Sequence, residues 1–555
     1  MLTIDRDQGI LLLPGGPQWS DRAHQLGLTW HRGLKTWWAP LRSRFAIGCL
    51  QLLSPDEITR DALPVLTELA AQEAGARADL VELEQARTDD AALNRLAAGL
   101  TYVTAPYRHQ VHALLHLLRF PRWGLFLEMG CGKTKVAVDA FRILQELGEV
   151  DRLLVVCPAR LQHDAWARDL AVHGGLVAQV LEGTRASKVQ QFQRSRSAVV
   201  VTNYEAITPD QLAEFVKVLA AGRWMIVFDE AARLGGKSMR HKVACELAAV
   251  ADRVYCLTGT PFSGKLERLH GLYHVLDGGE TFGPSFPRFL EVAQRLGAPV
   301  DWVGEVQWAK CPTFVASLRA GLARTSVTWE LTACLDMPAR VQRVVRVELG
   351  PEQRHLYDEA RCQSWDNTLV GVSDPAIVRT LRLAQVTSGF YWDREAGEYR
   401  RTAANAKLDV LEDMLADELA EAKVIIWSRF LEEVVMVREL LQRLKIGHAE
   451  LSGRIANPAK RDAELARFRG TPGCRVLVGT PMAGGEGLTI NEATVQVFYS
   501  VGYDWSVFAQ AMARNFRIGQ HRPTVVFQLL AEDTVDEDIH KCLAKKQNLR
   551  DVVVA

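Results

Sequence analysis

The sequence predicts an α/β protein built mainly from two tandem domains, each a parallel sheet with helices on both faces. Short runs rich in valine and isoleucine alternate with helix-length segments after Tyr102, first over about 122–260 and again over about 424–530. This alternation is typical of βαβ units, whose strands are buried on both faces. The 555 residues allow about three or four domains, so further segments accompany the two sheets.

Composition along the chain divides it into five segments. The N-terminal segment is rich in tryptophan and basic residues, the second is acidic and rich in Ala and Leu, and the fourth interrupts its helical pattern with Gly, Pro and aromatic residues. We expect a small N-terminal module at 1–53, a helical connector at 54–101, a first α/β domain at 102–275, an irregular helical linker at 276–345 and a second α/β domain at 346–555.

Charge and cysteine usage exclude several classes of protein. Lys and Arg total 66, as do Asp and Glu, so any polyanion must be bound by local clusters of charge. No apolar run is long enough to span a bilayer, and the acidic start is a poor signal peptide. The ten cysteines contain no Cys-x-x-Cys pair, which excludes a zinc ribbon of that pattern. We expect a soluble, intracellular protein that is located in the cytoplasm.

The segment EMGCGKT, residues 128–134, predicts a phosphate-binding loop between a strand and a helix. Glycines at 130 and 132 would let backbone N–H groups approach phosphate oxygens. Lys133 would contact the β- and γ-phosphates of ATP, and the Thr134 hydroxyl would face Mg²⁺. The full pattern begins with glycine where this chain has Leu127, so an ordinary glycine turn stays open. The candidate nucleotide-binding residues are Met129, Gly130, Cys131, Gly132, Lys133 and Thr134.

A second acidic motif follows a strongly apolar strand. The run Ile226-Val227-Phe228 ends in Asp229 and Glu230. Asp229 would hold Mg²⁺, together with Thr134, and Glu230 would orient and deprotonate the attacking water. The alternative is a solvated acidic turn at a strand end.

Further motifs extend this pattern through both halves of the chain. They are Thr258–Pro261, Ala483–Leu488, the run from Gln510 to Gln520 that ends in RIGQ, Thr534–Glu537, and the smaller match Lys407-Leu408. Together with EMGCGKT and DEAA, they resemble the superfamily 2 helicase-type ATPases and, within these, the Swi/Snf-like branch in a compact bacterial or phage form. The resemblance covers roughly residues 102 to 548 and implies two RecA-like domains.

The resemblance also implies roles for individual residues. Gln110 would read adenine, and Arg514 and Arg517, at helical spacing i and i+3, would be arginine fingers for the γ-phosphate. Their alternatives are a surface amide and a solvated basic stripe. The residues implied to couple hydrolysis to movement are Thr258, Gly259, Thr260 and Gln510. Those implied to contact nucleic acid are Arg160, Thr202, Asn203, Thr480, Gly485 and Gly487. Ala232 departs from the family, which usually has histidine there.

The N-terminal segment interleaves Trp30, Trp37 and Trp38 with Arg32 and Lys35. Aromatic and cationic side chains together suit base stacking and phosphate contact. The segment faintly resembles the small N-terminal modules of annealing-helicase-like relatives. Alternatively, the tryptophans form the core of a small β module.

The expected function is that of a DNA-dependent ATPase that uses ATP and Mg²⁺ to translocate on duplex or branched DNA. A helicase that separates DNA or RNA strands is one alternative. Another is a non-catalytic nucleic-acid clamp with a degenerate ATPase fold. A nuclease subunit is not supported, because no convincing PD…(D/E)xK cluster is found.

Overall fold

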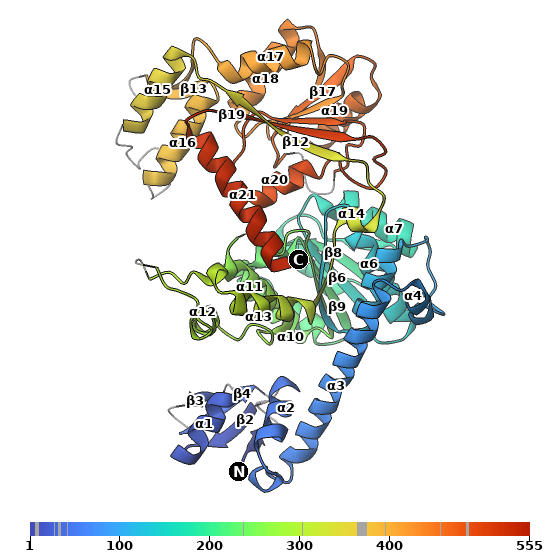
Figure 1. Ribbon diagram of the computed structural model, residues 1–555. Coiled ribbons are helices and arrows are strands. Elements are labelled where there is room, and N and C mark those ends of the chain that lie inside the picture. The colour runs from blue at the N-terminus through green and yellow to red at the C-terminus, as the bar shows by residue number, and fades with distance from the viewer. Residues whose placement is uncertain are drawn as a thin grey trace. The chain divides into compact units, whose positions relative to one another are not determined.

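The computed structural model (Figure 1) contains two compact units. The first is Met1–Leu100 with Val111–Pro121, and the second is Thr101–Gln110 with Arg122–Ala555. The residues that it describes are 1–5, 10–26, 28–31, 35–40, 43–236, 238–262, 264–301, 304–362, 375–393, 396–455, 457–483 and 488–554. Among these residues no helix is both long and apolar enough to cross a membrane.

The first unit contains a four-stranded antiparallel sheet in the order β1-β2-β4-β3. Its strands are β1 (Thr3–Asp5), β2 (Ile10–Pro14), β3 (Thr29–His31) and β4 (Thr36–Pro40). Its helices are α1 (Pro17–Gln25), α2 (Ser43–Leu52), the 3₁₀ turn η1 (Pro55–Glu57), α3 (Ala62–Ala86), α4 (Asp90–Leu96) and the part of α5 (Arg108–Arg119) from Val111 onward. Leu11 and Leu13 alternate into a small core with Ala23, Ala46 and Cys49.

The long helix α3 packs against α5 within this unit. His112 Nε2 lies 3.0 Å from the carbonyl oxygen of Leu83, and Arg119 forms an ion pair with Asp79. The acidic helical segment is therefore joined to the residues just before the phosphate-loop motif by polar contacts as well as by apolar packing.

The second unit begins with a seven-stranded parallel sheet in the order β11-β5-β10-β9-β6-β8-β7. The strands are β5 (Arg122–Leu127), β6 (Arg152–Cys157), β7 (Ala178–Val180), β8 (Val199–Asn203), β9 (Trp224–Asp229), β10 (Arg253–Leu257) and β11 (Ser326–Trp329). Every residue of β8, β9 and β10 is buried, which explains why these runs are continuously apolar rather than alternating.

Helical segments connect and cover this first sheet. They are α6 (Lys133–Glu146), the π-helical turn η2 (Gln162–Ala167), α7 (Arg168–Gly174), α8 (Arg185–Arg194), α9 (Pro209–Leu219), η3 (Ala231–Leu234), α10 (Met239–Val250), α11 (Leu266–Asp277), α12 (Phe286–Arg295), η4 (Trp308–Lys310), α13 (Pro312–Ala323) and α14 (Leu331–Cys334). Phe282, Phe289 and Phe314 pack into the same core as strands β9 and β10.

One expectation for the linker at 276–345 was wrong. We expected an irregular helical linker or insertion there, but Ser326–Trp329 forms β11, which pairs in parallel with β5. The edge strand β12 of the second sheet also begins inside this segment, at Arg340. Both sheets therefore take an edge strand from the chain between them.

The second sheet has six parallel strands in the order β12-β19-β18-β15-β17-β16. They are β12 (Arg340–Val347), β15 (Val424–Trp427), β16 (Gly447–Leu451), β17 (Cys474–Gly479), β18 (Val495–Phe498) and β19 (Thr524–Ala531). The helices are α15 (Pro351–Cys362), α16 (Pro375–Thr387), α17 (Ala406–Ala416), α18 (Leu431–Arg443), α19 (Pro458–Gly470), α20 (Trp505–Met512) and α21 (Val535–Val554), with a hairpin of β13 (Phe390–Asp393) and β14 (Glu398–Arg401). The expected α/β class with two parallel sheets is confirmed.

Candidate nucleotide-binding site

Three predicted motifs follow neighbouring strands of the first sheet. Strand β10 lies between β5 and β9, with Leu257 in register with Leu125 on one side and Asp229 on the other. Parallel strands end at one edge of a sheet, which is where open α/β folds bind ligands. The phosphate-loop motif after β5, the acidic pair at the end of β9 and the Thr258–Pro261 motif after β10 therefore meet at this edge.

The loop after β5 has the backbone shape expected of a phosphate loop. Gly130 and Gly132 adopt positive φ angles of 91° and 79°, and α6 begins at Lys133. A Cβ atom on Gly132 would lie 2.2 Å from Nε2 of Gln110, so a larger residue does not fit there. The N-terminus of α6 thus faces this edge with its positive dipole end.

The Lys133 side chain folds back along its own loop. Its Nζ donates hydrogen bonds to the carbonyl oxygens of Leu127 at 3.0 Å and Glu128 at 3.4 Å. A Cβ atom on Gly259 would lie 3.5 Å from the same Nζ and 2.9 Å from Cγ of Met129. The motif after β10 therefore packs directly against the loop and its lysine.

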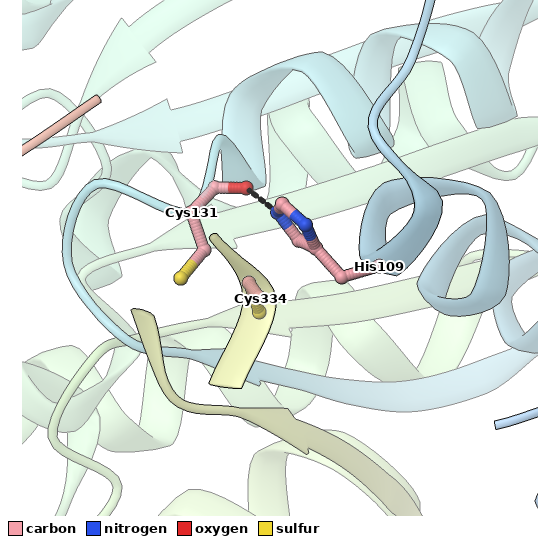
Figure 2. Close-up of side chains that lie close together, drawn as sticks. All are labelled: His109, Cys131 and Cys334. Carbon is pink, nitrogen blue, oxygen red and sulfur yellow. Dashed lines mark hydrogen bonds between the residues drawn. The ribbon is translucent and has the colours of Figure 1, made fainter. Parts of the chain in front are cut away.

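Two residues of α5 contact the backbone of the phosphate loop through polar atoms. Gln110 donates from Nε2 to the carbonyl oxygen of Cys131 at 3.2 Å, and its Oε1 accepts from the backbone N–H of Tyr107 at 2.9 Å. His109 Nε2 lies 2.9 Å from the same Cys131 carbonyl oxygen. A dashed line marks this contact in Figure 2. Because both polar atoms of the Gln110 amide are used here, its role as adenine reader stays a prediction. His109 was not singled out in the sequence.

The acidic pair occupies a buried and constrained position. Asp229 accepts at Oδ2 from the indole Nε1–H of Trp166 at 2.8 Å, and at Oδ1 from the backbone N–H of Glu230 at 2.9 Å. Burial raises the pKa of Asp229 to about 7, and the neighbouring Glu230 charge adds to this shift. Glu230 has a φ of 50°, a conformation that is uncommon outside glycine and concentrated at functional sites.

These groups fit a divalent cation. A buried carboxylate whose charged form is disfavoured by burial and by a second carboxylate gains from a nearby cation. Thr134 follows Lys133 at the start of α6 and is half-buried. Asp229 and Thr134 are the residues that would hold Mg²⁺.

The Thr258–Pro261 motif after β10 contains a hydrogen bond between two of its own residues. Thr258 is buried, and its Oγ1 accepts a hydrogen bond from the backbone N–H of Thr260 at 3.1 Å. Gln510, the fourth residue of the implied coupling set, lies on α20 of the second sheet and is half-buried. The coupling roles of these residues stay predictions.

The two candidate arginine fingers occupy different surroundings. If Gly130 carried a Cβ atom, that atom would lie 3.3 Å from Cγ of Arg517. Arg517 therefore lies close to the phosphate loop. Burial lowers the pKa of Arg517 to about 10, and the charge of Glu230 opposes that shift. Arg514 instead donates to the carbonyl oxygen of Leu488 at 3.2 Å and is buried in the second lobe. Helix α20 ends at Met512, so the expectation that both arginines share one helix face was wrong.

The candidate nucleic-acid contacts are distributed over both sheets. Thr202 and Asn203 end β8, and Asn203 Oδ1 accepts from Lys188 Nζ at 3.1 Å. Arg160 donates to the carbonyl oxygen of Met482 at 3.0 Å, while Thr480 follows β17 and accepts from the N–H of Ala483. Gly485 and Gly487 lie outside the described residues.

The two sheets, the phosphate loop and the acidic pair define a two-lobed helicase-type ATPase. Family models agree with this class: a SNF2-related domain matches residues 109–382, and a helicase conserved C-terminal domain matches residues 406–519. The chain therefore belongs to the SNF2-related family of helicase-type ATPases.

Relatives of the chain come from phage, bacteria and eukaryotes. "Putative protein p41" of Acyrthosiphon pisum secondary endosymbiont phage 1 is 24% identical over 481 residues, which cover 82% of this chain and 98% of that protein. The putative ATP-dependent helicase/translocase YwqA of Bacillus subtilis is 24% identical, with 81% and 48% covered. The CHD3-type chromatin-remodeling factor CHR7 of Arabidopsis thaliana is 24% identical, with 77% and 35% covered. The chain thus spans nearly all of the phage protein, but half or less of these two others.

Among solved structures, the chain is similar to the Sulfolobus solfataricus SWI2/SNF2 ATPase core in complex with dsDNA. Sequence identity is 20%, coverage is 81% of this chain and 93% of that one, and the TM-score is 0.37.

Proposed function

We propose that this protein is an ATP-driven motor that translocates on duplex or branched DNA. The observation that carries the proposal is the meeting of Lys133, Asp229 and Glu230 at one sheet edge, with Arg517 of the second lobe beside Gly130 of the loop. In a two-lobed ATPase, phosphoryl transfer requires catalytic groups from both lobes. The reason is that catalysis depends mainly on positioning and electrostatic stabilisation.

In the proposed hydrolysis of ATP, each group of the site has one role. The N–H groups of the loop and the start of α6 would bind phosphate oxygens, and Lys133 would exchange its two carbonyl contacts for the β- and γ-phosphates. Mg²⁺, held by Asp229 and Thr134, would neutralise charge on the phosphates. Glu230 would orient and deprotonate the attacking water. Arg517 would stabilise charge that develops on the γ-phosphate.

Movement would follow from the packing of the Thr258–Pro261 motif on the loop. Gly259 lies against Met129 and Lys133, so a shift of the loop on hydrolysis displaces this motif. Thr202, Asn203, Arg160 and Thr480 are the described residues proposed to hold the phosphates of the tracked strand. Ala232 in place of the usual histidine leaves the acidic pair intact, so we expect hydrolysis to be retained.

Two relatives favour this proposal over its alternatives. The Bacillus subtilis protein is named a putative ATP-dependent helicase/translocase, and the Arabidopsis thaliana protein is named a chromatin-remodeling factor. A non-catalytic clamp is disfavoured because every hydrolytic group is present in the chain. A strand-separating helicase on DNA or RNA is the remaining competitor. The cytoplasmic location stays a prediction.

The test is the ATPase rate of the full chain alone and then with single-stranded, duplex and forked DNA, and with RNA. Stimulation by duplex or forked DNA of about tenfold or more supports the motor. Displacement of a third strand from a triplex, without separation of a plain duplex, distinguishes translocation from unwinding. A low rate that no polymer changes would favour the clamp.

A further inference from the structure

Two cysteines and a histidine converge behind the phosphate loop, at the place shown in Figure 2. The sulfur atoms of Cys131 and Cys334 and one ring nitrogen of His109 all lie within 4.8 Å of one another. Cys131 belongs to the loop itself, whereas Cys334 ends the short helix α14, about two hundred residues later in the chain. Nothing in the proposed hydrolytic cycle uses these three side chains as reacting groups.

The surroundings of the two thiols differ in a way that suits thiol oxidation. Cys334 is half-buried, and hydrogen bonds from the Cys131 thiol and from His109 lower its pKa to about 6. The same thiol–thiol hydrogen bond and burial raise the pKa of Cys131, which is fully buried. A partly exposed thiolate beside a second, protected thiol is the arrangement found in peroxide-sensing cysteine pairs.

Another Cys–His cluster in the chain provides a contrast. Cys245 lies 3.2 Å from Nδ1 of His274 and 3.6 Å from Nε2 of His241. Burial nevertheless raises the pKa of Cys245 to about 12, so this thiol stays protonated near neutral pH. The cluster formed by His241, Cys245 and His274 contains one cysteine, so Cys245 serves as an internal control for a thiol that contacts histidine.

We propose that Cys334 and Cys131 form a hydroperoxide-sensitive thiol pair whose disulfide disables the phosphate loop. The Cys334 thiolate attacks the peroxide oxygen, giving a sulfenic acid and releasing hydroxide or alkoxide. The Cys131 sulfur then attacks the sulfenyl sulfur, and the hydroxyl group leaves as water once it takes up the Cys131 proton. Overall, two thiols and one hydroperoxide give one disulfide, one water and one water or alcohol.

The disulfide would act on the phosphate loop because Cys131 is itself a residue of that loop. A disulfide requires a sulfur–sulfur distance of about 2 Å, so the two residues must be drawn together. Cys131 lies between Gly130 and Gly132, both with positive φ, and Gly132 already abuts the Gln110 amide. A shift of Cys131 therefore turns N–H groups away from the phosphate positions. This consequence rests on the proposed ATP site, whereas formation of the disulfide does not.

The experiment treats reduced, full-length protein with a small molar excess of hydrogen peroxide. Non-reducing peptide mass spectrometry should find Cys131 linked to Cys334 as the main product. Affinity for a fluorescent ATP analogue should fall by about tenfold or more, because charge-assisted hydrogen bonds to phosphate are lost, and thiol reductant should restore it. Cys334→Ser should bind the nucleotide before and after peroxide, and Cys245→Ser should respond as the unaltered protein does.

A second variant traps the intermediate. In Cys131→Ser no resolving thiol remains, so Cys334 should accumulate as a sulfenic acid that dimedone labels. Absence of the 131–334 link while the exposed Cys362 is oxidised would overturn the proposal. One equivalent of zinc in the purified protein, absent from Cys334→Ser, would overturn it in favour of a metal site. If the link forms but the reduced protein binds no nucleotide, the proposed function fails and the thiol pair stands.

Discussion

The indole N–H of Trp166 donates a 2.8 Å hydrogen bond to the carboxylate of Asp229, and both side chains are buried. Trp166 lies in the π-helical turn η2 after β6, and π-helical turns are concentrated at functional sites. Since β6 neighbours β9 in the sheet, the turn after β6 can reach the end of β9. The bond fixes the orientation of a carboxylate that we propose to hold Mg²⁺.

We predict that Trp166→Phe raises the Mg²⁺ concentration needed for half-maximal ATPase activity and lowers kcat. The variant keeps an aromatic ring but removes a hydrogen bond to an ionisable group, worth about 1.5–3 kcal/mol. This corresponds to a loss of about tenfold to a hundredfold if the whole effect reaches the transition state. A Mg²⁺ titration of ATPase rate measures it.

Tyr204→Phe is the matched control for this variant. Its hydroxyl donates to the backbone carbonyl of Asp229 at 2.6 Å, not to the carboxylate. We expect a lower melting temperature with an unchanged Mg²⁺ requirement. If both variants change the Mg²⁺ requirement equally, Trp166 has no specific positioning role.

Lys133→Ala should abolish ATP turnover and leave the fold intact. The lysine is half-buried and its two present acceptors are loop carbonyls, so truncation removes no core contact. The lost interaction with developing phosphate charge is worth several kcal/mol, so less than about a tenth of the activity should remain. Lys217→Ala, at an exposed position on α9, controls for loss of a lysine. Normal ATP turnover in Lys133→Ala would contradict the assignment of residues 128–134 as a phosphate-binding loop.

Glu230→Gln and Arg517→Ala should separate ATP binding from hydrolysis. The glutamate acts on water and the arginine on developing charge, so both variants should bind ATP within about threefold of normal and lose kcat. Arg514→Ala should instead lower the melting temperature, because its buried guanidinium is bonded to the Leu488 carbonyl inside the second lobe. Equilibrium nucleotide binding, single-turnover kinetics and thermal melting together measure these effects. Equal losses of affinity and rate in the first two variants would contradict the roles.

The sheet edge could be predicted from sequence because its signals are local. Short apolar runs indicate the strands, and the residues after β5, β9 and β10 then meet by the rule for parallel strands. Strand β11 was missed because four residues, Ser326–Trp329, carry no clear period, and their pairing with β5 is a tertiary contact.

Individual side-chain contacts between distant segments could not be predicted. Trp166 and Asp229 are far apart in the chain, and no spacing relates them. The same holds for Lys407 and Asp536, which were noted only as family resemblances. In the structure, Lys407 Nζ lies 2.5 Å from Asp536 Oδ2 in a buried ion pair, so these motifs hold the second lobe together.

The buried His116 on α5 predicts a loss of stability in acid. Burial lowers its pKa from 6.5 to about 3, and the neighbouring His112 and Arg87 add to the shift. Because the folded-state pKa is the lower one, the unfolded chain binds more protons between pH 6.5 and about 3. The contribution of His116 to the free energy of unfolding is therefore at its maximum above pH 6.5. It decreases as the pH drops toward 3, by at most about 1.4 kcal/mol per pH unit.

His116→Phe should flatten this pH dependence. The ring already lies between those of His112 and Phe120, so phenylalanine fits an aromatic position. Urea unfolding at pH 4.5 and pH 7 measures the difference, with His521→Gln at an exposed position as the control. An equal fall in stability in both variants would show that other groups cause the acid sensitivity.

The N-terminal module should add DNA affinity without altering basal ATP hydrolysis. Trp30 is 40% exposed and its ring meets that of Trp37 edge-to-face at 5.3 Å, while Lys35 is exposed nearby. Trp37 is half-buried against the small core, so one tryptophan packs and the other offers a stacking face. Arg32 and the side chain of Trp38 lie outside the part of the chain that the structure describes.

Point substitutions test this module better than removal of the first hundred residues. Truncation would strip α5 of its contacts with α3, such as the one between His112 and Leu83. Trp30→Ala should raise the forked or duplex DNA concentration for half-maximal stimulation by about fivefold or more, since base stacking is worth about 1–3 kcal/mol. Lys35→Ala should reduce the slope of log affinity against log salt by about 0.9, the value for one duplex phosphate. Trp37→Ala, the control, should lower the melting temperature. Unchanged DNA dependence and salt slope in the first two folded variants would indicate a protein partner for this module.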